Sequence, residues 1–247
     1  MARPAARTAS MIQLLRMDGI PAPVEVRAHP TARRFTLRVS RTRRTVHLTV
    51  PASFDVKEAN RFLAQSLDWV IERLDGVPEA VPFRDGAQIP VRGITHGLRF
   101  LGHAVRGAVV VPASDGGAAL VVAGAAEHAP RRLKDWLIAE ARRDIDARVQ
   151  HHAAALGVRA RRITLRDQKS RWGSCTSDGN LSFSWRLVLA PPIVLDYVAA
   201  HEVAHLAEMN HGPRFWRLVA RTMPRMEEAK FWLRRNGADL YRYGAES

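Results

Sequence analysis

One stretch of the sequence combines strong apolar character with reactive side chains. Residues 192–206 are mostly apolar, and two prolines at their start, Pro191 and Pro192, suit the first turn of a helix. His201, Glu202 and His205 interrupt the apolar pattern as an HExxH string. Charged and imidazole side chains are rare on buried helices unless they have partners there. The stretch therefore predicts a buried helix that carries a metal site.

The spacing of these residues suggests the chemistry. Residues four apart on a helix lie on one face, so His201 and His205 can present ring nitrogens to the same ion, which we expect to be Zn²⁺. Zinc lowers the pKa of a bound water to about 7 and polarises a carbonyl, while a nearby carboxylate takes the proton of the water and passes it to the leaving amine. Glu202 is the predicted general base, and the predicted enzyme is a zinc metallopeptidase.

A catalytic zinc site needs a third protein ligand and one open position. His211, six residues beyond His205, is the leading candidate. Six further helical residues would carry it far round the helix axis, so the chain must turn before it, and Gly212-Pro213 supports a helix end there. The other third ligands that the sequence leaves open are Glu208, Glu227, Glu228 and Asp196.

The single cysteine, Cys175, bears on both the zinc site and the compartment. Structural zinc sites usually contain cysteine ligands, so a chain with one cysteine favours a catalytic site over a closed structural one. One cysteine also excludes an internal disulfide and fits a reducing compartment. No run approaches the ~18 apolar residues of a membrane span. We therefore expect a cytoplasmic protein.

The first half of the chain has the pattern of a small, mostly antiparallel sheet. Residues 35–39 and 46–50 alternate as in a β-hairpin, and residues 56–74 have helical spacing. Short strand-like segments separated by glycine-containing turns follow at 89–91, 98–101, 108–111 and 120–123.

The pattern changes to long helices from Pro130. A helical stripe of apolar residues comes first, and two shorter stripes lie on either side of Pro224. The first stripe consists of Leu133, Leu137, Ala141, Ile145 and Val149. We therefore predict an α+β fold with a flexible basic tail at 1–23, a β-rich N-terminal region at 24–125 and a helical metallopeptidase region at 126–247.

A second β-hairpin is predicted directly before the HExxH helix. Residues 162–165 and 181–185 alternate like its two strands. An edge strand beside the metal would hold an extended peptide through backbone hydrogen bonds, and Arg171 could then stabilise an oxyanion or a substrate carboxylate. Packing and salt bridges explain Arg171 and Trp172 equally well. Cys175 is interpreted as a small, buried apolar residue.

The chain is strongly basic, with a net charge of +14. Arginine supplies all but four of its 38 basic residues, and the planar arginine fork pairs with phosphate. DNA or RNA is therefore a candidate partner besides a peptide or protein substrate. A competing function from another class is a basic nucleic-acid-binding protein whose zinc site is structural or vestigial. Zinc-dependent hydrolysis of a non-peptide amide or ester is a third alternative, and the substrate and the oligomeric state do not follow from the sequence.

Several short segments carry a more specific signal. They are an RWGSC block in Ser170–Cys175, a WRL element that includes Arg186-Leu187, Tyr197-Val198 ahead of the HExxH string, and His211 followed by Phe215-Trp216. Residues 166–216, which contain them, resemble the signature region of the YgjP-like zinc metallopeptidases, relatives of the SprT-like proteins. The resemblance extends from about residue 30 to about residue 236.

This resemblance implies a zincin-like helical half. It also implies His201, His205 and His211 as the zinc ligands and Glu202 as the general base, in agreement with the spacing argument. The histidine spacing is shared with the metzincins, but Glu208 stands where they place a glycine. That departure argues against membership of the metzincins.

Overall fold

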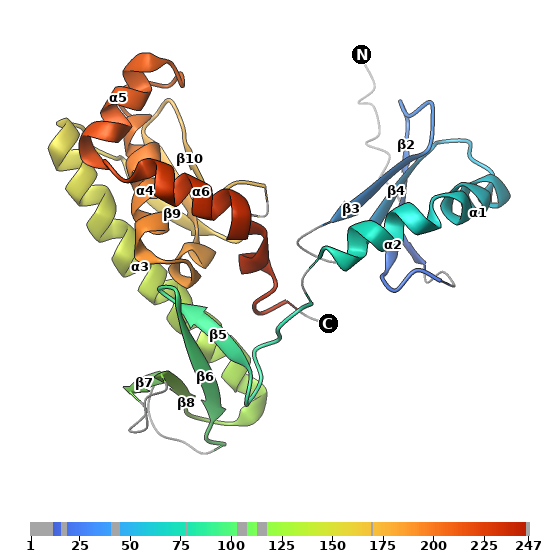
Figure 1. Cartoon of the computed structure of the whole chain (residues 1–247), viewed down its shortest axis with the longest axis horizontal. Helices are drawn as coiled ribbons and strands as arrows, with labels where there is room; N and C mark the ends of the chain where they lie inside the picture. Colours follow the sequence, from blue (N-terminus) through green and yellow to red (C-terminus); the bar gives the residue numbers. More distant parts are fainter. Residues whose placement is uncertain are drawn as a thin grey trace, which may run out of the picture. The chain divides into compact units, whose positions relative to one another are not determined.

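The structure is a computed structural model of the chain, and it describes residues 12–15, 19–40, 45–77, 79–102, 108–112, 118–168 and 170–245. The chain divides into two compact units, Met1–Glu79 and Ala80–Ser247. Over the described ranges the fold is α+β, with three small sheets and six α-helices, which confirms the predicted class (Figure 1). No helix in these ranges is both long and apolar enough to span a bilayer.

The first unit consists of a four-stranded sheet and two helices. The strand order is β1-β2-β4-β3, in which β2 and β4 are parallel and the other neighbours are antiparallel. Leu37 pairs with Leu48 and Val39 with Val46, which confirms the first predicted hairpin; its link at 41–44 lies outside the described residues. The elements are β1 (Ile12–Leu15), β2 (Val24–His29), β3 (Thr36–Ser40), β4 (Thr45–Pro51), α1 (Val56–Gln65) and α2 (Leu67–Asp75).

Two features of this unit differ in detail from the sequence pattern. The helix predicted over 56–74 is two helices that meet at Ser66, whose hydroxyl donates a 2.8 Å hydrogen bond to the carbonyl of Phe62. A serine that bonds the backbone in this way competes with the helical ladder, which explains the break. Strand β1 lies within the predicted tail at 1–23, of which residues 1–11 and 16–18 lie outside the described part.

The second unit begins with another four-stranded sheet and a long helix. The strand order is β5-β6-β8-β7, with β6 and β8 parallel, and the strands match the four predicted segments. Along the helix that follows, the predicted apolar stripe is buried. The elements are β5 (Gln88–Val91), β6 (Ile94–Phe100), β7 (Ala108–Pro112), β8 (Ala118–Val122) and α3 (Ala129–Leu156). The predicted boundary at residue 126 lies inside this unit, and a domain division there stays a prediction.

The turn between β5 and β6 fixes the approach to the HExxH helix. Arg92 and Gly93 both have positive φ, 50° and 78°. The guanidinium of Arg92 bonds to Asp144 of α3 at 2.8 and 2.9 Å. A Cβ atom on Gly93 would lie 3.0 Å from Cγ of Pro191. The turn is therefore held between α3 and the residue that precedes the helix.

The third sheet corrects the predicted pairing of the second hairpin. Its order is β10-β11-β9, where β9 is Arg162–Arg166, β10 is Gly173–Cys175 and β11 is Asn180–Ser184. Strands β9 and β11 are parallel, so the prediction that 162–165 and 181–185 form a hairpin is wrong. The hairpin consists of β10 and β11, because the chain reverses direction twice between β9 and β11.

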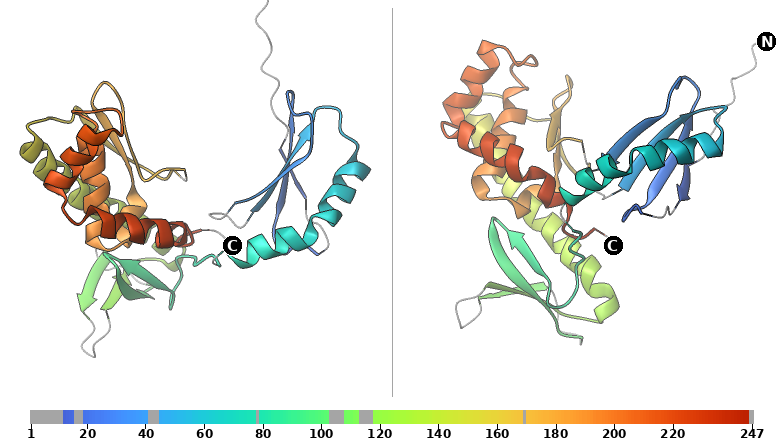
Figure 2. Two further views of the ribbon diagram at one scale, coloured as in Figure 1. Left: turned by 45° about the horizontal axis from the view of Figure 1, so that its top comes forward. Right: turned by 45° about the vertical axis from the view of Figure 1, so that its right-hand side comes forward.

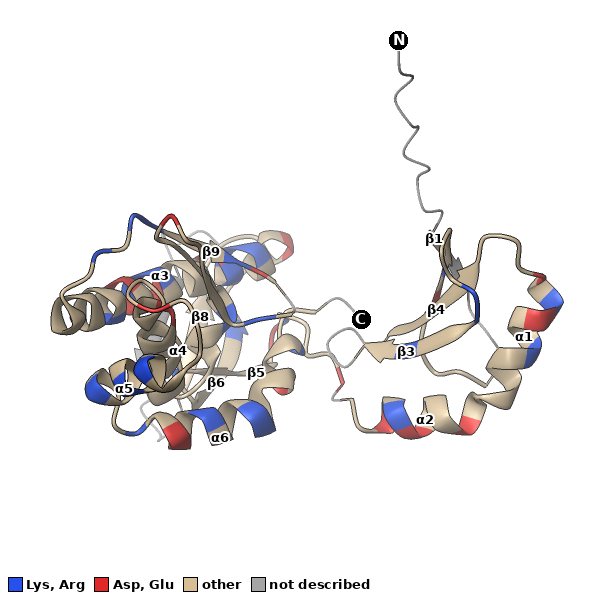
Figure 3. Ribbon diagram, turned by 90° about the horizontal axis from the view of Figure 1, so that it is seen from above, with Lys and Arg blue, Asp and Glu red and all other residues tan. Residues whose placement is uncertain are grey.

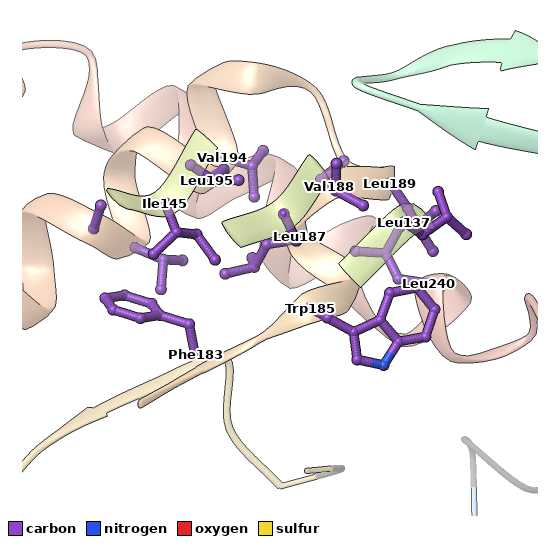
Figure 4. Packing of buried hydrophobic residues seen from close by; sticks show 14 of the residues in the cluster. Leu137, Ile145, Phe183, Trp185, Leu187, Val188, Leu189, Val194, Leu195 and Leu240 are labelled. Carbon is purple, nitrogen blue, oxygen red and sulfur yellow. The ribbon is translucent and has the colours of Figure 1, made fainter. Parts of the chain in front are cut away.

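The remaining helices surround the segment with the HExxH string. That segment forms α4 (Pro192–Ala204), which contacts α3, α5 (Pro213–Thr222), α6 (Met226–Asn236) and β10 (Figures 1 and 2). A 3₁₀ turn, η2 (Trp185–Leu189), joins β11 to α4, and a second, η3 (Gly237–Tyr241), follows α6. Leu187 and Val194 pack with Ile145 of α3 in the same apolar cluster (Figure 4). The predicted burial of α4 is therefore confirmed.

Candidate metal centre

Three histidines converge at the end of α4. His201 lies in its last turn, His205 directly follows its last residue, and His211 lies in the loop before α5. One ligand atom from each ring lies within 4.8 Å of the other two, and the Nε2 atoms of His201 and His211 are 3.1 Å apart. Among the described residues, no other His, Cys, Asp or Glu side chain belongs to a group this close.

The backbone turns where the sequence predicts it. Helix α4 ends at Ala204, whose carbonyl accepts the N–H of Glu208 at 3.0 Å. The N–H of Gly212 then bonds to the carbonyl of Asn210 at 2.7 Å, and α5 begins at Pro213. This reversal returns His211 to the face of α4 that carries His201.

The ring nitrogens of the cluster fit a divalent cation. His205 donates its Nδ1–H to the carbonyl of Glu208 at 3.1 Å, because a carbonyl can only accept, and this leaves Nε2 with its lone pair. Burial lowers the pKa of His201 to about 4, with further lowering from His205 and His211. Burial also lowers the pKa of His205. Neutral imidazoles are the metal-binding form, and three of them suit Zn²⁺ and similar ions.

Each of the four alternative third ligands forms an ion pair with a basic side chain. These pairs are Asp196 with Arg148, Glu208 with Arg214, Glu227 with Lys230, and Glu228 with Arg225. None of the four carboxylates belongs to the histidine group. The structure therefore groups the ring of His211, and none of these four carboxylates, with His201 and His205; the role of His211 as a ligand stays a prediction.

Phe215 lies against all three histidines. Its ring centroid is 4.9 Å from that of His201, 4.5 Å from His205 and 4.7 Å from His211, and the residue is fully buried. Helical spacing predicts that Phe215 packs as a core residue over the HExxH helix, but it does not predict the contact with the three histidine rings. Phe215 restricts the rotation of the three rings and so helps to fix the cluster.

The side chain of Glu202 lies against β10. The residue is 5% exposed, and burial raises the pKa of its carboxyl to about 8, against a lowering by the charge of Arg171. Its side chain packs against the backbone of Gly173. An opposite charge nearby favours the ionised form of a carboxyl group, so Glu202 would ionise more readily beside a bound cation.

The other residues of the RWGSC block have different surroundings. Trp172 packs on Tyr241 with ring centroids 4.9 Å apart, which supports a packing role. Cys175 is half-buried, and burial, followed by the charge of Glu202, raises the pKa of its thiol to about 11. The thiol therefore stays protonated near neutral pH. Arg171 is exposed, and its role stays open.

Comparisons with known proteins give one family match. A family profile described as "YgjP-like, metallopeptidase domain" matches residues 33–236, a range that includes Glu202 and the three histidines. No curated protein sequence matches the chain. Among solved structures, the chain is similar to the metallopeptidase zymogen of Pyrococcus abyssi abylysin, with 23% identity and a TM-score of 0.35 over 40% of this chain and 97% of that chain.

Proposed function

Because the chain belongs to the YgjP-like metallopeptidase domain family, we propose that it is a zinc-dependent peptidase with a zincin-like site. The proposal is carried by one observation, the convergence of His201, His205 and His211 at the end of a buried helix that also carries Glu202. Three neutral nitrogen ligands without a cysteine suit a catalytic zinc site, which keeps one position open.

Each residue has a part in this mechanism. His201, His205 and His211 would hold the ion, and the carbonyl of Glu208 orients the ring of His205. When bound, zinc supplies a Lewis acid for the substrate carbonyl and lowers the pKa of water to about 7. Glu202 accepts the proton of the attacking water and transfers it to the leaving amine.

The sheet beside the site offers a place for a peptide substrate. Strand β10 is at the end of the order β10-β11-β9, so among the described strands it pairs on one side only. An extended peptide can add to such an edge through backbone hydrogen bonds. Because β10 contacts α4, a peptide bound there would pass close to Glu202.

Metal analysis and a cleavage assay test the function. Protein purified without added zinc should contain close to one equivalent of the metal, and the zinc-loaded protein should cleave casein or an unstructured peptide. Glu202→Gln should keep the metal but lose roughly 10²–10⁴-fold in kcat. Equal turnover by wild type and the variant would remove Glu202 from the mechanism, and an inactive zinc-loaded wild type would contradict peptidase function.

A second candidate function, nucleic-acid binding, is favoured by the surface of α5. Arg214, Arg217 and Arg221 are exposed and follow one another at helical spacing. Helix α5 carries basic residues and no acidic residue (Figure 3). Arg221 donates a 3.2 Å hydrogen bond to the carbonyl of Ala155, near the end of α3. The exposed Arg159 follows that end closely in the chain. The arginines thus gather where α5 meets the end of α3.

Salt dependence tests this second function. Binding of a labelled DNA oligonucleotide should weaken steeply between about 50 and 200 mM salt. Arg214→Gln with Arg217→Gln should reduce the slope of log K against log salt by about 0.9 for each lost phosphate contact. Glu202→Gln should leave DNA binding unchanged. Binding that does not respond to salt would contradict the proposal.

A further inference from the structure

The backbone of β10 packs directly on the side chain of Glu202 at Gly173. A Cβ atom on Gly173 would lie against Oε1 of Glu202, 2.6 Å from its Cγ and 2.7 Å from its Cδ. Real Cβ atoms essentially never approach other atoms this closely, so any residue other than glycine requires a displacement. We propose that Gly173 is a positioning residue, which sets the place of the Glu202 carboxylate by leaving room for it against the strand.

The requirement at Gly173 is for space and not for an unusual backbone conformation. Gly173 does not have a positive φ, whereas Gly179 in the same hairpin has a φ of 78°. An alanine would therefore fit the backbone of β10 without strain. The alanine methyl group would instead overlap the Glu202 side chain.

Strand β10 is not free to move away from Glu202. Gly173 pairs with the fully buried Phe183 of β11. The carbonyl of Trp172 accepts a 2.8 Å hydrogen bond from the N–H of Ser184. Trp172 in turn packs on Tyr241. These contacts tie the strand to β11 and to η3.

The backbone of α4 is also fixed. Ala200 precedes Glu202 on this helix and Val203 follows it, and both are fully buried. The helix also contacts α3, α5 and α6. A Cβ atom at position 173 would therefore displace the flexible part of the contact, which is the side chain of Glu202. A misplacement of about 1 Å at a reacting group is enough to cost roughly 10²-fold in rate.

The consequence is specific to proton transfer. The three histidines lie at the end of α4 and in the loop after it, and none of them is among the nearest neighbours of a Cβ atom at Gly173. Gly173→Ala should therefore retain zinc affinity within about threefold and lose roughly 10²-fold in kcat with little change in KM. This expectation rests on the proposed peptidase function.

A matched glycine provides the control for activity. Gly97 lies in strand β6, lacks a positive φ, and a Cβ atom there would have no neighbour within 4 Å. Gly97→Ala should keep the kcat and zinc affinity of the wild type. Wild-type kcat in Gly173→Ala would overturn the inference, and so would a loss of kcat that is fully explained by lost zinc.

A stability cycle tests the same contact without any assay of catalysis. Melting temperatures are compared for wild type, Gly173→Ala, Glu202→Ala and the double variant. If alanine at 173 collides with Glu202, its cost in melting temperature should disappear once Glu202 is shortened to alanine. An equal cost in both backgrounds would overturn the inference. If alanine costs no stability, a crystal structure of Gly173→Ala should show a displaced Glu202 carboxylate, and an undisplaced one would overturn it.

The two proposals fail in different ways. If zinc-loaded wild type cleaves no peptide, the peptidase proposal fails, while the stability cycle and the variant structure still decide whether Gly173 places Glu202. If wild type cleaves peptides, but alanine at 173 has the same measurable cost in both backgrounds or leaves the Glu202 carboxylate undisplaced, only the positioning inference fails.

Discussion

The Nε2 atoms of His201 and His211 lie 3.1 Å apart, although a helix end and a tight turn separate the two residues along the chain. A continuous helix would place residue 211 on another face and about three turns away. The reversal after Ala204 is therefore as necessary to the candidate metal centre as the histidines themselves.

Removal of His211 should weaken zinc binding more than removal of a group that only hydrogen-bonds to a metal ligand. Removal of such a hydrogen-bonding group lowers metal affinity about 10–100-fold, so we expect His211→Ala to lower zinc affinity more than about 100-fold. His128, which is exposed outside the cluster, provides the control, and His128→Ala should bind zinc like wild type. Competition with a chromophoric chelator measures the affinities. Unchanged affinity in His211→Ala would move the third ligand elsewhere.

Zinc should stabilise the folded protein. A ligand at 100 times its Kd that binds only the folded state adds about 2.7 kcal/mol to the free energy of unfolding. Chelator treatment should therefore lower the melting temperature, and added zinc should restore it. In His201→Ala the two treatments should give nearly the same melting temperature, and a full zinc-dependent shift in that variant would argue for binding at another site.

Phe215→Leu tests whether the ring beneath the histidines matters for the metal. The smaller side chain leaves the three imidazoles less tightly packed, and we expect zinc affinity to fall about 10–100-fold, as for other groups that orient ligands. Phe231, which is 59% exposed on α6, is the control. Phe231→Leu should leave the affinity unchanged, and equal affinities in all three proteins would limit Phe215 to a role in packing.

The ion pair of Asp196 should matter most at neutral pH. Burial alone would raise the pKa of this carboxyl, but hydrogen bonds and charge from His152 and Arg148 outweigh it and hold the pKa below its ordinary value. Because the folded-state pKa is lowered, the stabilisation is present above about pH 4 and is lost as the pH falls through the folded-state value.

Asp196→Asn should therefore cost roughly 1–3 kcal/mol of unfolding free energy at pH 7, and the difference from wild type should shrink below about pH 4. Urea titrations at several pH values measure it. Asp135→Asn, at an exposed residue of α3 that lies 3.8 Å from Arg131, should have little effect at any pH. A difference between wild type and Asp196→Asn that stays constant with pH would rule out this linkage.

Two glycines with nearly the same positive φ separate backbone strain from crowding. Gly86 and Gly93 have φ of 76° and 78°, but a Cβ atom on Gly86 has no neighbour within 4 Å, whereas one on Gly93 meets Pro191 at 3.0 Å. Gly86→Ala should cost about 1–2 kcal/mol, and Gly93→Ala roughly 2–4 kcal/mol. Equal costs would show that the contact with Pro191 yields easily.

Much of the fold is visible in the local pattern of residues. The stripe from Leu133 to Val149 predicts α3, the prolines and apolar residues predict α4, and the alternation over 35–50 predicts the β3–β4 pair. The turn before His211 is also predicted, because glycine and proline act on the backbone close to where they stand. Each of these features depends on residues near one another in the chain.

The sequence by itself determined α3, α4, the β3–β4 pair and the candidate ligand set, since periodicity and spacing are local properties. Only the tertiary structure decided that β9 and β11 are parallel, that Phe215 lies under the histidines and that Gly173 faces Glu202. These relationships join segments far apart in sequence, and the free energy that selects them comes from the packing of the whole core, to which no single stretch of residues gives access.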